Sequence, residues 1–484
     1  MMKETKEKKK LSLTQGCVIL MVTYVILSVA LYFIAGEQFK SKVLEKSIAS
    51  VDATTPTGEI LKGDTIEQTF VMESDILSSI SLKFATYGRQ NAGTIRVQLL
   101  DDLDKGILFE RQLDVAKLND NEFVTIGLDK DIKNLKGRTL RISVSSETGS
   151  PGNAVTLWYN GNVQQPGQEL FIDGKPTAGV LCFSVEERQS LLFGKYYFVI
   201  MGVIGLLLLG YCLRLIHCRK TGKKSLGNNV LNAFTKYSFL LNQLVSRDFK
   251  TKYKRSVLGV LWSFLNPLLT MSVQYLVFST IFKSNIPNFA VYLMVGIVFY
   301  NFFNEATNMG LMSIVGNSSL ITKVYIPKYI FPVSRVLSSA INLLISIIPL
   351  LLMALIMRTP ITPALLLLPF SIICTIAFCI GMAFILSSAM VYFRDMQFLW
   401  SVLSMLWMYA TPIIYPESIL PQKLMPIFKM NPLYHFIRFS RTIILDGVSP
   451  EPQAYLFCLI AAFVPLVIGA IIFKKTQDRF VLNI

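Results

Sequence analysis

The sequence has 484 residues, of which 52% are hydrophobic and only 16% are charged, and its mean hydropathy is +0.50. This composition excludes an ordinary soluble domain and indicates a membrane protein. The net charge is +16, but residues 37–188 hold 22 of the 31 acidic and 17 of the 47 basic residues. The basic residues outside that segment flank apolar runs, which favours membrane lipid and topology over nucleic acid as the reason for the charge.

Eight apolar runs are long enough to cross a membrane, since a helix needs roughly 20 apolar residues to cover a hydrocarbon core of about 30 Å. These runs are residues 11–36, 196–213, 256–282, 284–304, 336–357, 359–393, 396–416 and 452–473. Basic residues precede the first run, follow the second and follow the last. The positive-inside rule therefore predicts a multi-pass protein of the plasma membrane with both termini in the cytoplasm. A cleaved signal peptide is the alternative for the first run, but its length favours a retained anchor.

Residues 37–192 form a polar block between the first two runs, so we expect them to be extracytoplasmic. Apolar and polar residues alternate over residues 80–84, 95–99, 140–144, 155–159 and 181–185, as they do in half-buried strands. Turn-forming residues separate these stretches. About nine short strands without a convincing helix predict an antiparallel, jelly-roll-like sandwich. The predicted fold class is thus an α-helical polytopic membrane protein with 2+6 transmembrane helices and an inserted all-β sandwich.

Three aromatic residues of this block, Tyr87, Trp158 and Tyr159, are candidates for glycan binding, because exposed rings stack on sugar faces. The alternative is that each ring belongs to the core of the sandwich. The cluster at residues 101–104 fits a solvated turn better than a calcium site. Of the seven cysteines only Cys182 lies in the block, and the two histidines are far apart in sequence. We therefore predict no disulfide in the block, no metal site and no catalytic residue.

The segment that leads into the last six runs has an unusual pattern. Residues 228–243 mix apolar and polar positions as in an amphipathic helix that lies on the cytoplasmic surface. A basic stretch follows over residues 250–255, and positive-inside anchoring is its simpler explanation. That explanation does not account for Asp248, Tyr253, Gly259, Trp262 and Pro267 at their positions.

Four distinct motifs follow one another along the chain from residue 226 onward. They are RDFKTKYKRSVLGVLWSFLNP at 247–267, NSSLITKVYIPKYIFPVSRV at 317–336, VYFRDMQFLW at 391–400, and TPIIYPESILP with NPLYHFIRFSRTIILDG at 411–421 and 431–447. In this order they resemble the permease subunits of ABC-2-type exporters for O-antigen, teichoic acid and related cell-surface polysaccharides. The β-block departs from the usual shorter permeases.

The resemblance implies roles for several residues. A gate helix would include Arg247, Asp248, Lys252, Tyr253 and Arg255. A cytoplasmic segment that couples the permease to an ATPase would include Asn317, Ser318, Lys323, Pro327 and Lys328; the alternative is an ordinary basic loop. No segment matches G-x-x-x-x-G-K-[ST], so we expect no cofactor on this chain, with ATP and Mg on a nucleotide-binding ATPase subunit. Half-transporters of this kind imply a homodimer, so a second copy of the chain is a further partner.

A path for a glycan should offer aromatic rings and few fixed charges, because sugars present apolar C–H faces beside many hydroxyls. The candidates are Trp262, Trp400, Trp407, Tyr409, Tyr415 and Tyr434. The alternative is that these rings pack between helices or anchor at the membrane interface. Glu305 and Arg394 are expected near an interface, where the cost of a charge is modest.

The sequence thus divides into five predicted segments. These are 1–36, the N-terminus and first helix; 37–192, the β-sandwich; 193–218, the second helix; 219–256, the linker and gate helix; and 257–484, the six-helix domain. The leading hypothesis is the permease subunit of an ATP-driven exporter of a lipid-linked cell-surface polysaccharide. Two alternatives are an ABC-2 exporter of a smaller lipid or drug, and a membrane-anchored glycan-binding scaffold without transport.

Overall fold

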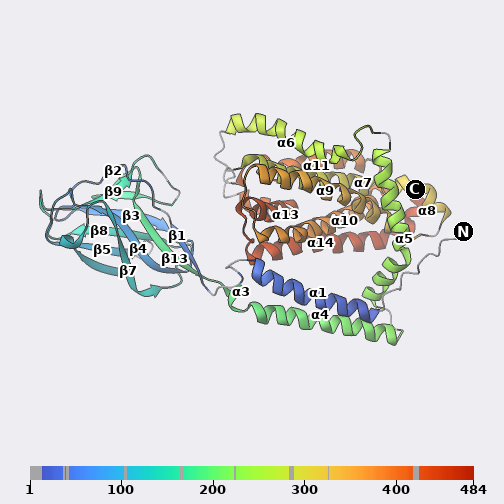
Figure 1. The fold of residues 1–484 in the computed structure, drawn as a ribbon, viewed down its shortest axis with the longest axis horizontal. Coiled ribbons are helices and arrows are strands. Elements are labelled where there is room, and N and C mark those ends of the chain that lie inside the picture. Colours follow the sequence, from blue (N-terminus) through green and yellow to red (C-terminus); the bar gives the residue numbers. More distant parts are fainter. Residues whose placement is uncertain are drawn as a thin grey trace. The chain divides into compact units, whose positions relative to one another are not determined.

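The computed structural model describes residues 13–35, 39, 43–48, 50–102, 106–163, 165, 167–222, 225–254, 256–282, 288–324, 326–417 and 424–483. The chain divides into two compact units. One, the β unit, is Glu37–Tyr197, and the other, the helical unit, joins Met1–Gly36 to Phe198–Ile484. Figure 1 draws the strands of the first and the helices of the second.

The β unit contains two antiparallel sheets. The first has the order β1-β13-β4-β9-β12, with β2 paired to β9 and β7 paired to β4. Its strands are β1 Val43–Ile48, β2 Thr55–Pro56, β4 Ile76–Ala85, β7 Glu122–Ile132, β9 Thr156–Asn160, β12 Val180–Leu181 and β13 Phe183–Ser190. The second has the order β11-β10-β3-β8-β5-β6. Its strands are β3 Thr65–Val71, β5 Thr94–Asp101, β6 Ile107–Asp114, β8 Thr139–Ser146, β10 Leu170–Ile172 and β11 Lys175–Thr177; the 3-10 turn η1, Val115–Lys117, follows β6.

The core of the β unit lies between the two sheets. Each of the five stretches in which apolar and polar residues alternate lies in a strand or runs into one. The apolar residues at the alternating positions are buried, except Tyr159, which packs at the edge of the core. The ring of Phe70 on β3 contacts that of Phe183 on β13, with centroids 5.7 Å apart. The thirteen strands in the described part exceed the predicted nine, because β2, β10, β11 and β12 are two or three residues long and too short to show a period.

The acidic cluster of the β unit is paired with arginines. Asp101 accepts a hydrogen bond from Arg138 at 2.9 Å, and Asp102 accepts one from Arg141 at 2.6 Å. Asp104 lies outside the described residues. Since guanidinium groups neutralise these two carboxylates, the pairs account for Asp101 and Asp102 without a bound metal ion.

The helical unit begins with an antiparallel hairpin of α1, Leu13–Ile34, and α4, Tyr197–Lys220; the short α3, Leu192–Lys195, precedes α4 in the β unit. Tyr24 of α1 donates a hydrogen bond to the carbonyl of Met201, 2.6 Å away, and the ring of Tyr32 lies 5.0 Å from that of Phe198. The end of α1 and the start of α4 therefore lie together, and so do the start of α1 and the basic end of α4.

The rest of the helical unit is a bundle crossed at one end by α5. Its elements are α5 Leu226–Tyr253, α6 Leu261–Phe282, α7 Phe289–Leu311, η2 Val315–Asn317, α8 Ser318–Lys323, α9 Ile330–Ile356, η3 Pro363–Leu367, α10 Leu368–Tyr392, α11 Met396–Tyr409, α12 Met425–Lys429, α13 Pro432–Arg441, the π-helical turn η6 Thr442–Asp446, α14 Pro452–Thr476, η7 Gln477–Arg479 and α15 Phe480–Asn483. Figure 1 shows α5 running across the ends of the bundle helices, at the same end as α8.

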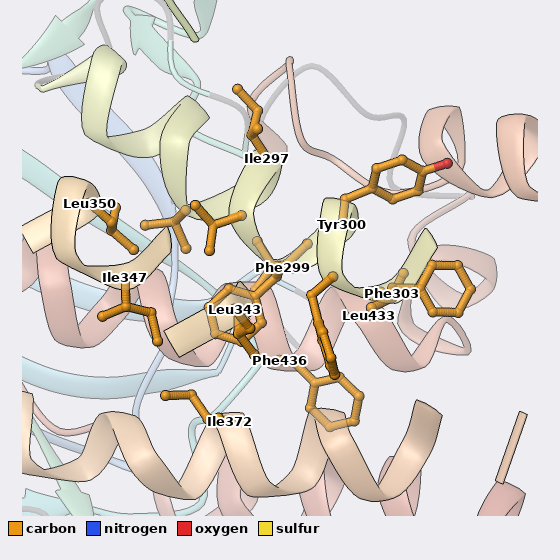
Figure 2. Close-up of a cluster of buried hydrophobic side chains, with 14 of the residues drawn as sticks. Ile297, Phe299, Tyr300, Phe303, Leu343, Ile347, Leu350, Ile372, Leu433 and Phe436 are labelled. Carbon is orange, nitrogen blue, oxygen red and sulfur yellow. The ribbon is translucent and has the colours of Figure 1, made fainter. Parts of the chain in front are cut away.

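The core of the bundle surrounds α7, most of whose residues are buried. Phe299, Phe303 and Phe436 meet residues of α9 and α10 in the cluster drawn in Figure 2. Helices α10 and α14 approach closely because Gly381 and Gly469 face each other; a Cβ on Gly469 would lie 2.3 Å from the carbonyl oxygen of Gly381. This close packing makes α7, α9, α10 and α14 the rigid part of the unit.

The described helices differ from the predicted spans in two features. Seven of them are long and apolar enough to cross a membrane on their own, and the eighth predicted span falls on α11, which has only 14 residues, about 21 Å at 1.5 Å per residue. Helix α7 continues to Leu311 although the predicted run stops before Glu305. The charge of Glu305 does not end the helix, because Lys252 and Asn342 bind its carboxylate.

Replacing Phe70 by Ala removes a ring that is fully buried between the two sheets. We expect the free energy of unfolding of the β unit to fall by about 3–5 kcal/mol, the usual cost of such a truncation. Cys182 provides the measurement, because burial raises the pKa of its thiol to about 11 and keeps it unreactive until the unit unfolds. Alkylation of Cys182 is measured in the full chain by mass spectrometry. In Phe70→Ala it should begin at a lower denaturant concentration than in the unaltered chain.

The control for this experiment is Phe123→Ala, since Phe123 is an exposed residue of β7. An equal shift of the Cys182 alkylation midpoint in both variants would show that the ring of Phe70 has no special place in the core.

Candidate functional site

A polar cavity of about 280 Å³ lies where the end of α5 meets α6, α7 and α9. Its lining is Lys252, Tyr253, Trp262, Ser263, Asn266, Pro267, Val298, Asn301, Phe302, Glu305, Ser339, Asn342, Leu343 and Ser346. Three amides, three serine hydroxyls and an indole are therefore gathered inside an otherwise apolar bundle. Polar groups in such surroundings are costly unless they have partners or face a water-filled space, which makes this cavity the candidate site.

A hydrogen-bond network ties α5 to the bundle at the mouth of the cavity. Lys252 forms an ion pair with Glu305 at 2.8 Å, and Asn342 donates a hydrogen bond to the same carboxylate oxygen at 2.7 Å. The hydroxyl of Tyr253 donates to Asn342 Oδ1 at 2.9 Å and also meets the hydroxyl of Ser263. Because Lys252 and Glu305 neutralise each other, the network presents hydrogen-bonding groups without net charge.

A tight turn between α5 and α6 brings these groups together. Gly259 has a positive φ of 50°, and its N–H donates a hydrogen bond to the hydroxyl of Ser256 at 3.0 Å. A residue with a side chain rarely adopts that backbone conformation, so glycine fits the turn. The turn folds α6 back beside the end of α5. Trp262 on the first turn of α6 thereby lines the cavity and remains 46% exposed.

A second polar cluster, the Asp248 cluster, joins α5 to the segment after α7. Asp248 is 3% exposed, and its Oδ1 accepts hydrogen bonds from Arg247 at 2.9 Å and 3.0 Å and lies 3.3 Å from Arg335 of α9. Arg247 also donates to Asn317 Oδ1 at 3.3 Å, and Asn317 donates to the carbonyl of Ser313 at 2.7 Å. The structure thus brings the predicted gate residue Arg247 into contact with the predicted coupling residue Asn317, and the gate residue Asp248 binds Arg247. Arg255, another predicted gate residue, lies outside the described residues.

The remaining predicted coupling residues lie around α8. Ser318 begins α8 and the exposed Lys323 ends it. Pro327 precedes α9, and Lys328 donates a hydrogen bond to the carbonyl of Gln477 at 2.6 Å. This bond ties Lys328 to η7 near the C-terminal end of the chain, so Lys323 and Lys328 have different surroundings.

The predicted path aromatics do not form one lining. Of the six candidates, Trp262 alone belongs to the described lining of the cavity. Trp400 is buried against Phe303 and Trp407, with ring centroids 6.1 Å apart in both pairs. In this single chain Trp400 therefore fits the packing alternative, since no surface of its ring is free.

The other three aromatic candidates lie near the segment that follows α11. Tyr415 donates a hydrogen bond to the carbonyl of Tyr409 at 2.6 Å, and Tyr409 is 61% exposed. Tyr434 is buried and donates to Glu417 at 3.0 Å. Of these rings, Tyr409 has the most surface available to a ligand.

Arg441 holds the non-helical backbone after α11. It is buried, and its guanidinium donates hydrogen bonds to the carbonyls of Tyr292, Pro412 and Ile413 at 2.6–3.3 Å. The guanidinium also lies over the ring of Tyr292, 3.4 Å from its centroid. The bonds to Pro412 and Ile413 satisfy carbonyl groups that lie outside any helix, which is the condition for irregular backbone inside a membrane.

The glycan-binding candidates of the β unit differ in their surroundings. Tyr87 is 43% exposed and stacks with Arg89, whose guanidinium carbon lies 4.9 Å from the ring centroid. Trp158 is half-buried, and its indole N–H donates to Asn121 at 2.8 Å. Tyr159 packs at the edge of the core. Tyr87 and Trp158 thus keep part of their rings accessible, whereas Tyr159 fits the core alternative better.

Sequence reasoning missed the polar half of the cavity. Asn266, Asn301 and Asn342 lie within apolar runs and carry no charge, so they do not interrupt a hydropathy pattern. Their signal is that each is a strongly polar residue within a predicted span, where a functional role is the default expectation.

Comparisons with known proteins match this helical region. The model of the ABC-2 type transporter family matches residues 240–445. The chain is 31% identical over 244 residues to the O-antigen export system permease protein RfbA of Klebsiella pneumoniae, covering 50% of this chain and 93% of that protein. It is 30% identical over 246 residues to the RfbA protein of Myxococcus xanthus, and 23% identical over 244 residues to the polysialic acid transport protein KpsM of Escherichia coli. The match to the Myxococcus protein covers 50% of this chain and 95% of that protein. The match to KpsM covers 49% of this chain and 92% of that protein.

The helical unit is therefore that of a multi-pass membrane transporter subunit. The chain belongs to the ABC-2 type transporter family, which confirms the resemblance seen in the sequence motifs. The β unit, Glu37–Tyr197, lies before the residues that the family model matches.

Replacing Lys252 by Met removes the ion pair that holds the end of α5 over the cavity. A partly exposed pair of this kind is worth about 0.5–1 kcal/mol, so we expect the cavity to open about twofold to fivefold more often. Ser346 lies on the cavity wall, and the measurement is the rate at which the thiol of a Ser346→Cys variant reacts with a polar thiol reagent. Lys250→Met, at an exposed position of the same helix, is the control; equal rates in both variants would exclude a role of the pair in closing the cavity.

Replacing Arg441 by Lys keeps the charge but loses the planar fork that reaches three carbonyls. Among the described residues Arg441 is the donor to Ile413, whereas Pro412 also accepts from the hydroxyl of Tyr292 at 3.4 Å. Because a buried carbonyl left without a donor costs about 1–3 kcal/mol, we expect a loss of about 1–3 kcal/mol in stability. A lower midpoint of thermal unfolding of the purified chain in detergent would show it. The more exposed Arg438→Lys on the same helix should leave the midpoint nearly unchanged, and an equal effect of both variants would contradict the assignment.

Proposed function

We propose that the chain is the membrane subunit of an ATP-driven exporter that moves a lipid-linked cell-surface polysaccharide across the plasma membrane. The observation that carries this proposal is the polar cavity in a chain whose relatives are named O-antigen export permease and polysialic acid transport protein. Amide and hydroxyl groups beside an indole suit a ligand with many hydroxyls and apolar C–H faces. The cavity would receive the glycan end of the substrate where α5 meets the bundle.

The motor of this exporter would be a separate nucleotide-binding subunit that holds ATP and Mg. The exposed end of α8, with Lys323, supports a docking role for the segment from Asn317 to Lys328, which is short and polar. A second copy of the chain would complete the pathway around a twofold axis, since one six-helix bundle is a thin wall for a polymer. In this arrangement Tyr409, Tyr415 and Trp407 would line the path near the segment that follows α11.

The proposed topology has eight crossings, with α11 and the following segment as the seventh. The antiparallel α1–α4 hairpin supports it, because the hairpin brings the basic end of α4 to the level where α1 begins. Basic residues favour the cytoplasmic side, so both termini would be cytoplasmic and residues 37–192 extracytoplasmic. The five segments predicted from the sequence, from 1–36 to 257–484, would be the units of this arrangement.

The β unit would then meet the glycan outside the cell, with Tyr87 and Trp158 as contact residues. This part of the proposal also separates it from the alternatives. An exporter of a smaller lipid or drug has little need for a glycan-binding domain, and a scaffold has no need for a polar cavity beneath α5.

The test is ATP-dependent movement of lipid-linked polysaccharide into proteoliposomes that contain the chain and its copurified ATPase. We expect Asn301→Leu to reduce export at least tenfold, because it replaces a hydrogen-bonding wall of the cavity with an apolar one. Asn308→Leu is the matched control: it lies two turns further along α7, outside the cavity lining, and binds Asn304. Equal export by both variants would remove the cavity from the pathway, and export of a small lipid but no glycan by the unaltered complex would favour the alternative substrate.

A further inference from the structure

The Asp248 cluster joins three segments that are far apart in the sequence. Asp248 lies on α5, Arg335 on the second turn of α9, and Asn317 between α7 and α8. Around the cluster, Leu244 of α5 and Ile321 of α8 belong to one buried apolar group together with residues of α9, α10 and α14. The cluster is therefore the polar centre of an apolar contact between α5, the segment after α7 and the rigid part of the bundle.

The charges of the cluster depend on the single carboxylate. Arg247 and Arg335 both bind Asp248 Oδ1, so two guanidinium groups share one negative charge. Removal of that charge would leave two cations near each other, and Arg335, whose side chain is 24% exposed, would lose its acidic partner, which is destabilising. Asp248 thus holds α5 and α9 together, and it orients the Arg247 that binds Asn317.

The carboxylate of Asp248 can also accept further hydrogen bonds. Its Oδ2 is buried and has no hydrogen-bond partner among the described residues, although a carboxylate oxygen accepts more than one hydrogen bond. Arg335 approaches only Oδ1, at 3.3 Å. A small movement of α5 against α9 can therefore give Arg335 the second oxygen and make the pair bidentate. The cluster has two arrangements available without breaking the link.

We infer that Asp248 is a positioning residue that makes α5 follow the Asn317 segment, so that a movement imposed on that segment reaches the end of α5 and the cavity. This inference rests on the proposed function in one respect: the movement would come from the nucleotide-binding subunit. Asp248 touches no substrate in this scheme. Its effect is on the efficiency with which ATP hydrolysis is converted into export.

The first arm of the experiment measures the link in the chain alone, in lipid nanodiscs. Spin labels are placed at Lys250→Cys and Ser319→Cys, both exposed, with Cys218→Ala because the other six cysteines are buried. The unaltered cluster should give a narrow distribution of distances between the labels, and Asp248→Asn a broader one. Asp395→Asn, an exposed carboxylate at the start of α11, should match the unaltered cluster. An unchanged distribution in Asp248→Asn would overturn the inference, whatever the substrate is.

The second arm measures coupling in the complex with the ATPase. For Asp248→Asn we expect ATP hydrolysis within twofold of the unaltered complex and export per ATP at least tenfold lower; export per ATP within twofold would overturn the inference. Arg247→Gln removes the group that joins Asp248 to Asn317 and should show the same loss, which keeps the test available if Asp248→Asn fails to assemble. Failure of the unaltered complex to move any polysaccharide would refute the proposed function, while the distance measurement would still judge the role of Asp248.

Discussion

The buried guanidinium of Arg441 is the interaction on which the membrane-embedded architecture depends. A helix satisfies its own backbone, but the segment after α11 is not helical, and hydrocarbon offers no water to its carbonyls. Arg441 donates to the carbonyls of Pro412 and Ile413 in this segment, and it also binds the carbonyl of Tyr292 on α7. A helix of 14 residues can therefore end inside the bundle, and the chain can return through α12 and α13 before α14 begins.

The two ends of the bundle are consequently built in different ways. At the Arg441 end, fixed hydrogen bonds to backbone join α7, the segment after α11 and α13. At the α5 end, side chains join other side chains through ion pairs and amides, as at Lys252 and Glu305. Contacts between long, partly exposed side chains are individually weak and exchangeable. The structure therefore places its adaptable contacts around the cavity and its fixed ones at the opposite end.

Much of this arrangement could be predicted from the sequence, for identifiable reasons. The core strands of the β unit follow an alternating pattern because each has one buried face, as at Leu140, Ile142 and Val144. The short length of α11 could not be predicted, because the apolar run continues past the end of the helix. The carbonyl of Pro412 in that continuation is bound by Arg441, which lies 29 residues further along the chain. The cavity was also missed, since its asparagines are uncharged. The link between Arg247 and Asn317 joins residues 70 apart, which no local pattern records.

The polarity of the two ion pairs on α5 limits how this helix can move. Asp248 and Lys252 are four residues apart, so they lie on one face, one turn from each other. Asp248 meets the cation of Arg335, whereas Lys252 meets the anion of Glu305. A slide of α5 by one turn, about 5.4 Å, in the direction that carries Lys252 toward Arg335 would oppose two positive charges. Tilting of α5 about the Asp248 cluster separates Lys252 from Glu305 and Tyr253 from Asn342, but it keeps the buried carboxylate paired. The charges thus favour rotation of the cavity end of α5 over translation of the whole helix.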